Sequence, residues 1–143
     1  MIHPVELPPD IATGLLISTV HRYCQKVLNT ALAPIGIEER HFATLAVLAG
    51  TGPLTQRRLT EVLDLDKSSL GRIIDDLEQR GLAERRPVPG DRRAHAVHLT
   101  VAGRRTVADG QRIAAEVGRQ LFGGLSAAQR RALDKALRAI LGQ

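Results

Sequence analysis

The chain has 143 residues, of which 43% are hydrophobic and 24% are charged, and its formal net charge is +5. This composition fits one globular domain and excludes a disordered chain, and the single cysteine, Cys24, excludes an internal disulfide and a cysteine-rich zinc site. The start of the chain has no secretory signal pattern and no segment has the apolar length of a membrane span, so we expect a cytoplasmic protein without a membrane partner.

The first predicted helix runs from Asp10 to Leu32. Apolar residues recur in it at helical spacing, at Ile11, Leu15, Leu16, Val20, Tyr23, Val27 and Leu28. Asp10 follows two prolines and is the predicted N-cap. Pro34 and Gly36 are predicted to end the segment.

Three shorter helices are predicted in the middle of the chain, over residues 38–49, 56–63 and 67–80. The sequence Gly-Thr-Gly-Pro at 50–53 separates the first from the second, and Thr55 is the predicted cap of the second. Residues 64–66 form a tight connection to the third helix. Gly81 is a stop signal at its end.

After Gly81 the pattern changes to two short strands, 82–86 and 94–99. His95, Val97 and Leu99 share one face of the second strand, because strand side chains alternate. Val88-Pro89-Gly90-Asp91 fits a type II turn, in which proline presets φ and glycine accepts a positive φ. The stretch is therefore a predicted β-hairpin with arginines at its tip.

Two helices follow the hairpin. Thr100 is the predicted cap of a long helix from Val101 to about Phe122. Ser126 and Gln129 form a capping-box pattern that opens the last helix. The expected fold is mainly α with a small β-hairpin, in the order α-α-α-α-β-β-α-α.

Two short helices, a tight connection and a hairpin form the winged helix-turn-helix arrangement, which suits duplex DNA because a major groove admits one helix. The recognition helix would be 67–80. Its outer face near its start carries the predicted base and phosphate contacts Lys67, Ser68, Ser69 and Arg72. Gln56 and Arg57, at the start of the preceding helix, are predicted to contact phosphates. Asp75, Asp76 and Glu78 restrict entry into the groove to the N-terminal half of the recognition helix.

The hairpin tip has a predicted role of its own. A thin, arginine-tipped ribbon can reach the minor groove, where the negative potential is high in A·T-rich DNA. We expect Arg92 or Arg93 to enter that groove. Asp91 is predicted to brace the wing by holding the guanidinium of Arg93 in a bidentate pair.

Residues 52–103, "GPLTQRRLTEVLDLDKSSLGRIIDDLEQRGLAERRPVPGDRRAHAVHLTVAG", resemble the MarR family of bacterial winged-helix regulators. The specific pieces are "PLTQRRL", "LEQRGLAERR", "GDRR" and "HLTVAG". The resemblance implies a homodimer, with dimerisation helices in 1–36 and 101–143 and a winged helix-turn-helix domain in 37–100. It also implies that Asp91 and Arg93 take the wing's acid and arginine roles. Leu70-Gly71 and Glu38 depart from the family pattern, which is more polar at the first place and often has a capping threonine at the second.

The function that we expect is a DNA-binding transcriptional repressor, without cofactor, that binds double-stranded DNA as a homodimer on a pseudo-palindromic operator. A small-molecule ligand is expected to bind between the dimerisation helices and the winged domain and to release the DNA. Few aromatic residues predict a mostly aliphatic pocket. Its predicted lining is His21, Tyr23, His41 and Phe42.

Three other functions are compatible with single features of the sequence. Cys24 could make the chain a redox sensor, but it lies in the apolar stripe of its helix, which favours a buried, inert thiol. His21 and His41 could meet at a metal, but two ligands without an acid cluster are weak, so no metal site is predicted. An enzyme is not expected, because no phosphate loop, nucleophile elbow or pair of catalytic carboxylates is present.

Overall fold

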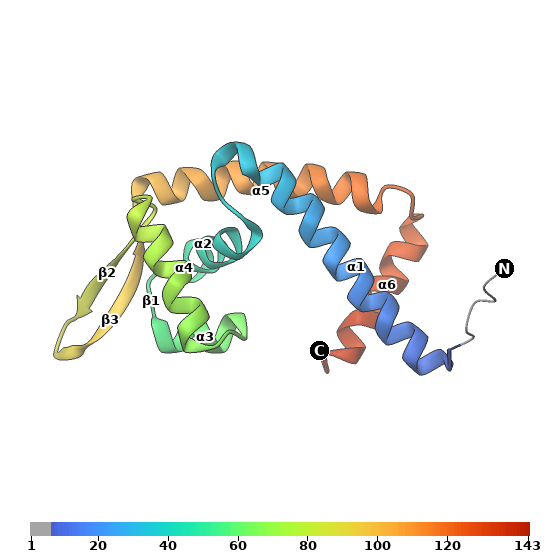
Figure 1. Cartoon of the computed structure of the whole chain (residues 1–143), viewed down its shortest axis with the longest axis horizontal. Coiled ribbons are helices and arrows are strands. Elements are labelled where there is room, and N and C mark those ends of the chain that lie inside the picture. Colours follow the sequence, from blue (N-terminus) through green and yellow to red (C-terminus); the bar gives the residue numbers. More distant parts are fainter. Residues whose placement is uncertain (1–6) are drawn as a thin grey trace.

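The computed structural model describes residues 7–143, which form six α-helices, a short 3-10 helix and one three-stranded sheet (Figure 1). In chain order the elements are α1 Pro9–Leu32, η1 Ala33–Ile35, α2 Glu39–Thr51, β1 Leu54–Thr55, α3 Gln56–Leu63, α4 Lys67–Gln79, β2 Ala83–Val88, β3 Asp91–Leu99, α5 Val101–Phe122 and α6 Ala127–Ile140. The predicted mainly helical fold with a hairpin wing is confirmed. The predicted order lacked η1 and β1.

Most of the predicted helix caps are confirmed. The side chain of Thr55 accepts a hydrogen bond from the backbone N–H of Arg58 at 3.2 Å, and Thr100 does the same for Gly103 at 3.0 Å. Ser126 and Gln129 cap each other reciprocally. These bonds satisfy N–H groups that have no partner within the helix.

The predicted cap of α1 is wrong. Helix α1 begins at Pro9 with Pro8 as its N-cap, so Asp10 lies in the first turn instead. Proline suits the first helical position because its φ is preset and it has no N–H to satisfy there. Asp10 still acts favourably near the positive end of the helix dipole.

Helix α2 also ends later than the glycine pattern predicts. It continues through Gly50 to Thr51, and Gly52, with φ +84°, is its C-cap. A glycine near an exposed helix end costs only about 1 kcal/mol, so Gly50 alone does not stop the helix. The end requires the positive φ of Gly52.

The sheet has the strand order β1-β3-β2, and all its pairs are antiparallel. Val88 lies opposite Asp91, so Pro89-Gly90 is a two-residue turn, and the φ of +83° at Gly90 agrees with the predicted turn. Both hairpin strands reach closer to the turn than predicted: β2 continues through Pro87 to Val88, and β3 begins at Asp91, where Asp91, Arg92 and Arg93 are all polar and show no hydrophobic alternation. Strand β1 has only two residues, too few for a pattern to reveal.

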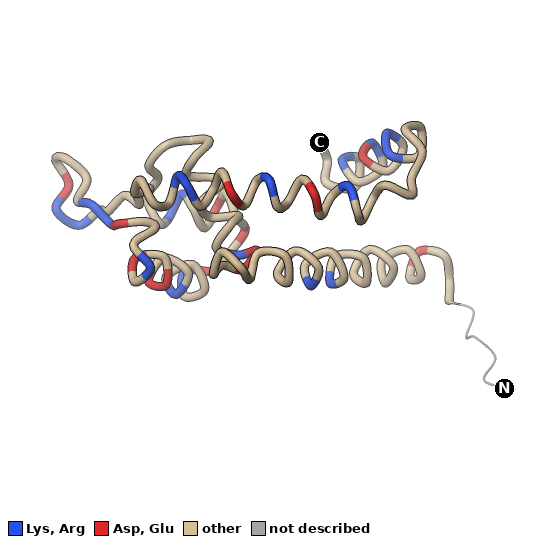
Figure 2. Tube along the Cα trace, turned by 90° about the horizontal axis from the view of Figure 1, so that it is seen from above, with Lys and Arg blue, Asp and Glu red and all other residues tan. Residues whose placement is uncertain are grey.

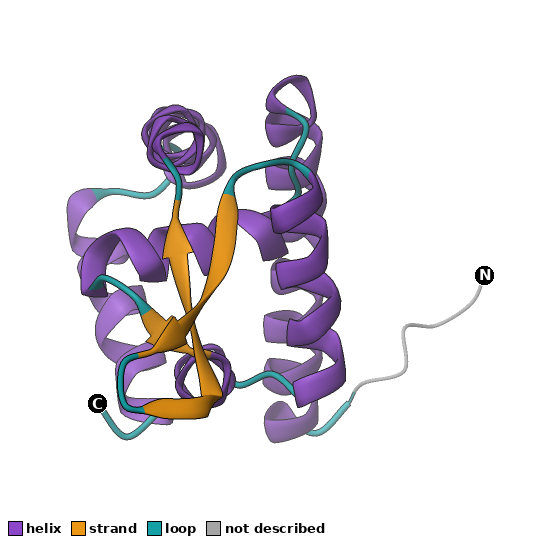
Figure 3. Cartoon of the chain, turned by 90° about the vertical axis from the view of Figure 1, so that its left-hand side faces the viewer, coloured by secondary structure: helices purple, strands orange, loops and turns teal. Residues whose placement is uncertain are grey.

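The core lies between the helices α2, α3 and α4, the sheet and the near end of α5. Its fully buried side chains are Leu32, His41, Thr44, Leu45, Leu59, Leu70, Ile74, Leu77 and Val97. Val97 and Leu99 face this core as predicted, whereas His95, on the same face nearer the tip, is exposed. The sheet is the outermost layer at the end that faces the viewer in Figure 3.

Helices α1 and α6 lie at the other end of the molecule, away from the wing (Figure 1). Helix α6 has no buried residue, and the first half of α1 is exposed throughout. Their exposed large apolar side chains are Ile11, Leu15, Leu16, Ile17, Val20, Tyr23, Leu133, Leu137 and Ile140. Over residues 7–143, the structure contains no helix with the length and apolarity needed to span a bilayer.

Candidate nucleic-acid interface

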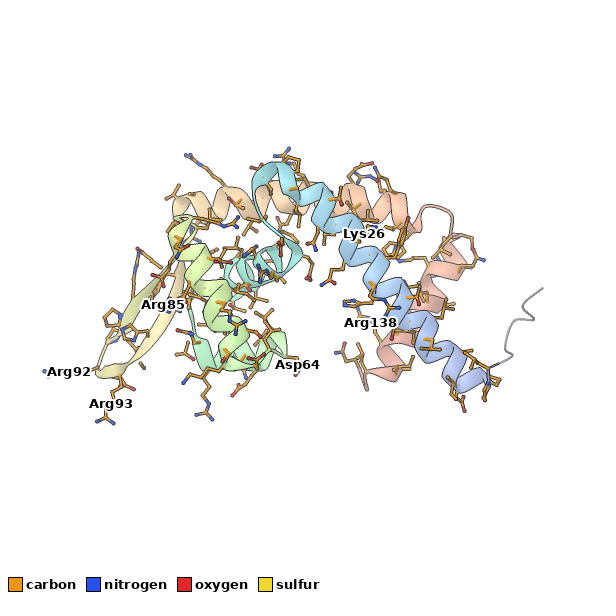
Figure 4. The ribbon with its side chains drawn as sticks, viewed as in Figure 1. Lys26, Asp64, Arg85, Arg92, Arg93 and Arg138 are labelled. Carbon is orange, nitrogen blue, oxygen red and sulfur yellow. The ribbon has the colours of Figure 1, made fainter. Side chains whose placement is uncertain are left out.

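The wing tip and the N-terminal end of α4 lie at the same edge of the molecule, the lower edge in Figures 1 and 4. Helix α4 descends from the base of the hairpin to α3, and the two strands descend beside it. Arg92 and Arg93 point away from the helices at the tip (Figure 4). One helix end projects from the surface beside a thin loop with positive charge. This shape fits the grooves of duplex DNA.

The start of α4 is organised by Asp66. This N-cap carboxylate accepts the backbone N–H of Ser69 at 2.9 Å and its hydroxyl at 2.5 Å. The hydrogen bonds from Ser69 lower the pKa of the Asp66 carboxyl. Lys67, Ser68 and Arg72 remain exposed on the outer face, whereas Ser69 is half-buried and its hydroxyl is already engaged. The structure therefore presents three of the four predicted contacts.

The start of α3 differs from the prediction. The side chain of Arg57 is 91% exposed, and its Nε lies 3.6 Å from Oε1 of Glu61. Gln56 is half-buried, and its side-chain oxygen accepts a hydrogen bond from Nε of Arg85 at 2.9 Å. Gln56 thus supports the wing from within, while Arg57 is open to a phosphate.

The wing carries the predicted exposed charges, but Asp91 contacts the backbone of Arg93 and not its guanidinium group. Figure 2 shows a run of positive charge at the tip of the wing beside an acid, and Figure 4 places Arg92 and Arg93 there. Asp91 accepts the backbone N–H of Arg93 at 3.0 Å, and within residues 7–143 neither arginine has an ion-pair partner. The predicted bidentate pair is absent because a short aspartate side chain reaches the N–H two residues ahead, as in an Asx turn. Asp91 shapes the turn and leaves both guanidinium groups free.

Two acids of α4 hold the wing in place. Arg85 of β2 forms ion pairs with Asp75, at 2.8 Å, and with Glu78. Its side chain is 25% exposed. Burial lowers the pKa of Arg85, but the hydrogen bonds to Asp75 and Glu78 outweigh it and raise the pKa. Arg85, Asp75, Glu78 and Gln56 form a cluster that we call the Arg85 clamp. No local sequence pattern predicts it, because its members lie on three elements.

Asp76 of α4 faces the opposite way, toward α2. Nε2 of His41 lies 3.3 Å from its carboxylate, and Nη2 of Arg40 lies 3.8 Å from it. His41 is 1% exposed. Burial lowers the pKa of His41 below its ordinary value of 6.5, although the bond to Asp76 raises it in part. The recognition helix is thus held from two sides by its own acids.

A cavity of about 240 Å³ lies between α1, the start of α2 and α5. Its lining is His21, Cys24, Gln25, Leu28, Glu39, Ala114, Val117, Gly118, Leu121 and Phe122. Of the four predicted lining residues, only His21 faces it. Tyr23 lies on another side of α1, the ring of Phe42 packs against Gly110, and His41 is enclosed beside Asp76.

The structure also places the cysteine considered for redox sensing and the two histidines considered for metal binding. Cys24 is half-buried rather than buried, because α1 is covered on one side only, and it lines the cavity. His21 is exposed on α1 and His41 is enclosed in the core, so the structure does not bring them together. Within residues 7–143 no three histidine, cysteine or acidic side chains are grouped to hold a metal ion.

The model of the MarR family matches residues 35–94. A MarR regulator from Methanosarcina mazei Go1 is similar over 91% of this chain and 94% of its own, with 31% identity and a TM-score of 0.83. The chain belongs to the MarR family. A cysteine-to-serine mutant of MarR from Escherichia coli, solved with operator DNA, covers 92% of this chain and 94% of its own with 29% identity and a TM-score of 0.86.

Among curated proteins of the family, the multiple antibiotic resistance protein MarR of Salmonella typhimurium is 36% identical over 93 residues. That match spans 65% of this chain and 65% of the relative's length. Relatives of the chain are named as transcriptional regulators, among them the repressor NicR of Pseudomonas putida and the Methanosarcina mazei protein. Family membership therefore supports the expectation that this chain does not catalyse a reaction.

Proposed function

We propose that this chain is a DNA-binding transcriptional repressor that acts as a homodimer. Two α4 helices enter successive major grooves, and each wing reaches the adjacent minor groove. The observation that carries the proposal is the joint placement, at one edge, of the exposed Lys67, Ser68 and Arg72 and of the unpaired Arg92 and Arg93. The structural relative solved with operator DNA supports the same use of this fold.

The exposed apolar faces of α1 and α6 support the dimer. Residues 9–23 of α1 carry large apolar side chains that are 40–64% exposed, and Ile140 of α6 is 65% exposed. Figure 2 shows that this part of α1 is almost free of charge. Soluble monomers rarely leave such a continuous apolar surface in water. We therefore assign residues 7–36 and 101–143 to dimerisation and 37–100 to DNA binding; residues 1–6 of the predicted first segment lie outside the described residues.

The cavity between α1 and α5 supports regulation by a small molecule. It is mostly apolar, Glu39 is among its lining residues, and it joins the dimerisation helices to the first turn of α2. A ligand there can alter the angle between α1 and the winged domain, and hence the distance between the two recognition helices. An apolar compound with a hydrogen-bond donor or a positive charge fits this lining.

The test is the affinity of the purified protein for the promoter fragment beside its own gene, measured by fluorescence anisotropy at several salt concentrations. Arg72→Ala and Arg93→Ala should each weaken binding by about 1–3 kcal/mol, because each removes a charged DNA contact. Arg112→Ala is the matched control, because Arg112 lies on α5 and pairs with Asp109. Equal effects of all three would contradict the assigned surface.

A further inference from the structure

His41 is the buried histidine of the described chain, and both its ring nitrogens are engaged. The backbone N–H of Glu38 donates to Nδ1 at 3.0 Å, within the first turn of α2. On the other side Nε2 lies 3.3 Å from Oδ2 of Asp76 on α4. The side chain of His41 is 1% exposed, whereas that of Asp76 is 39% exposed, so the ring itself is shielded from water.

These partners fix the tautomer of the ring. Nδ1 accepts a hydrogen bond and therefore carries no proton, so the neutral imidazole has its proton on Nε2 and donates it to Asp76. The neutral ring satisfies both neighbours at once. A second proton, on Nδ1, would face the N–H of Glu38, and the bond between them would be lost.

The first turn of α2 is also tied to α1. The backbone N–H of Glu39 donates to the side-chain oxygen of Asn29 at 2.7 Å. Glu39 lines the cavity between α1 and α5, and His41 follows two residues later. A short chain of hydrogen bonds thus runs from α1, through the start of α2, to the recognition helix.

We propose that His41 is a positioning residue, which in its neutral form joins the first turn of α2 to α4 and holds the recognition helix at the angle that DNA binding requires. The proposal rests on the proposed function for its consequence, because it describes how the DNA-binding helix is held. It does not make His41 a DNA contact. Uptake of a proton at Nδ1 removes the bond to the N–H of Glu38, so the ring no longer ties the first turn of α2 to α4, and the affinity for the operator falls.

The charged groups around His41 influence the pH at which its ring takes up a proton. Arg40 on α2 and Arg80 at the end of α4 disfavour a charged ring, and Asp76 favours it. Burial is the largest influence, so the pKa of His41 lies below 6.5.

The first arm of the test needs no DNA. Side-chain ¹H–¹⁵N NMR of the full-length protein should show His41 as the Nε2–H tautomer, titrating below pH 6.5. The Nδ1–H tautomer, or titration at or above that pH, would overturn the proposal. Amide exchange in α4 should be faster in His41→Gln than in the wild type, and unchanged exchange would also count against it.

The second arm measures affinity for the promoter fragment from pH 8 to pH 5.5. His41→Gln keeps the cap of α2, because glutamine suits that position of a capping box, but it cannot take up a proton. It should bind at least about fivefold more weakly than the wild type at pH 8. The difference should shrink as the pH falls and the wild-type ring becomes protonated.

Asp76→Asn keeps an acceptor for Nε2–H and removes the charge that favours protonation, so the fall in affinity should move to lower pH. Asp109→Asn removes a carboxylate that pairs with Arg112 on the surface of α5, and should leave the profile unchanged. Identical pH profiles for wild type, His41→Gln and Asp76→Asn would overturn the proposal. Absence of binding by every protein would instead refute the proposed function, and the NMR and exchange arm would still decide the role of His41.

Discussion

Neighbouring arginines in β2 differ in what they do. Arg85 is 25% exposed and contacts acids of α4 and Gln56 of α3, whereas Arg86 is 56% exposed and pairs only with Glu84 two residues away. A partly buried arginine that leaves two carboxylates unpaired when removed costs more than a surface pair. The identity of the residue therefore matters less than the partners that the fold supplies.

Arg85→Gln should lower the free energy of unfolding by about 1–3 kcal/mol. Arg86→Gln, its matched control, should lower it by less than about 1 kcal/mol, because its pair is exposed to water. Urea denaturation followed by circular dichroism measures both. Equal losses would mean that the Arg85 clamp contributes no more than an ordinary surface pair.

Gly71 lies inside α4, and a Cβ placed there meets nothing within 4 Å. Gly71→Ala should therefore stabilise the fold by about 0.5–1 kcal/mol, because alanine is the better helix former. The same change should weaken operator binding, since the added methyl group lies next to Arg72 on the side that approaches DNA. Gly50→Ala, also in open space, should stabilise without this loss. Tighter or equal operator binding by Gly71→Ala would show that DNA does not come close at this point.

At the scale of elements, the packing of α5 against the hairpin depends on a glycine. A Cβ on Gly103 would lie 2.0 Å from the carbonyl oxygen of Leu82, which is backbone and cannot move aside. Gly103→Ala should destabilise the fold by about 1–3 kcal/mol or more, measured by the urea midpoint. Gly118→Ala on the same helix has open space and should not destabilise. A stable Gly103→Ala would contradict this close contact.

The joint between α2 and α4 predicts a pH dependence of stability. Because the unfolded chain takes up a proton at His41 near pH 6.5 and the folded chain only at lower pH, the folded state is disfavoured as the pH falls. Stability should be unaffected by this group above pH 6.5 and should decline from there through the pKa of the folded state. Denaturant curves of wild type and His41→Gln, compared at each pH, isolate this contribution. A difference that stays constant with pH would contradict it.

The sequence predicts the helices and their caps well, because apolar spacing and capping residues such as Thr55, Thr100 and Ser126 act over a few residues. Strand β1 is not predictable from the sequence, because its two residues form a strand only by pairing with β3. The Arg85 clamp and the His41–Asp76 contact join residues up to 35 apart, and no local pattern encodes them. The exposed tip arginines were predictable; the role of Asp91 on the backbone was not.

At the scale of the whole molecule, the two ends have different surfaces. The wing, α3 and the start of α4 carry exposed charge, while the first half of α1 is almost free of charge and α6 carries charges beside its exposed Leu133, Leu137 and Ile140 (Figure 2). We expect the apolar end to be covered by a second copy, so that sedimentation at micromolar concentration should give a dimer. Leu16→Glu, at a residue that is 64% exposed, should produce monomers by placing charge in that interface. A folded monomer of the wild type would contradict the dimer.

The measurement that tests the central claim most directly is a gel-shift series on the promoter site with 0, 5 and 10 base pairs inserted between its half-sites. Two identical α4 helices related by a two-fold axis should read half-sites about one helical turn, 10–10.5 base pairs, apart on one face of the DNA. The 5-base-pair insertion should abolish tight binding, because it turns the second half-site to the opposite face. The 10-base-pair insertion should restore it only poorly, because it stretches the dimer. Unchanged affinity across the series would mean that the two subunits bind independently, and would contradict a dimer that acts as one DNA-reading unit.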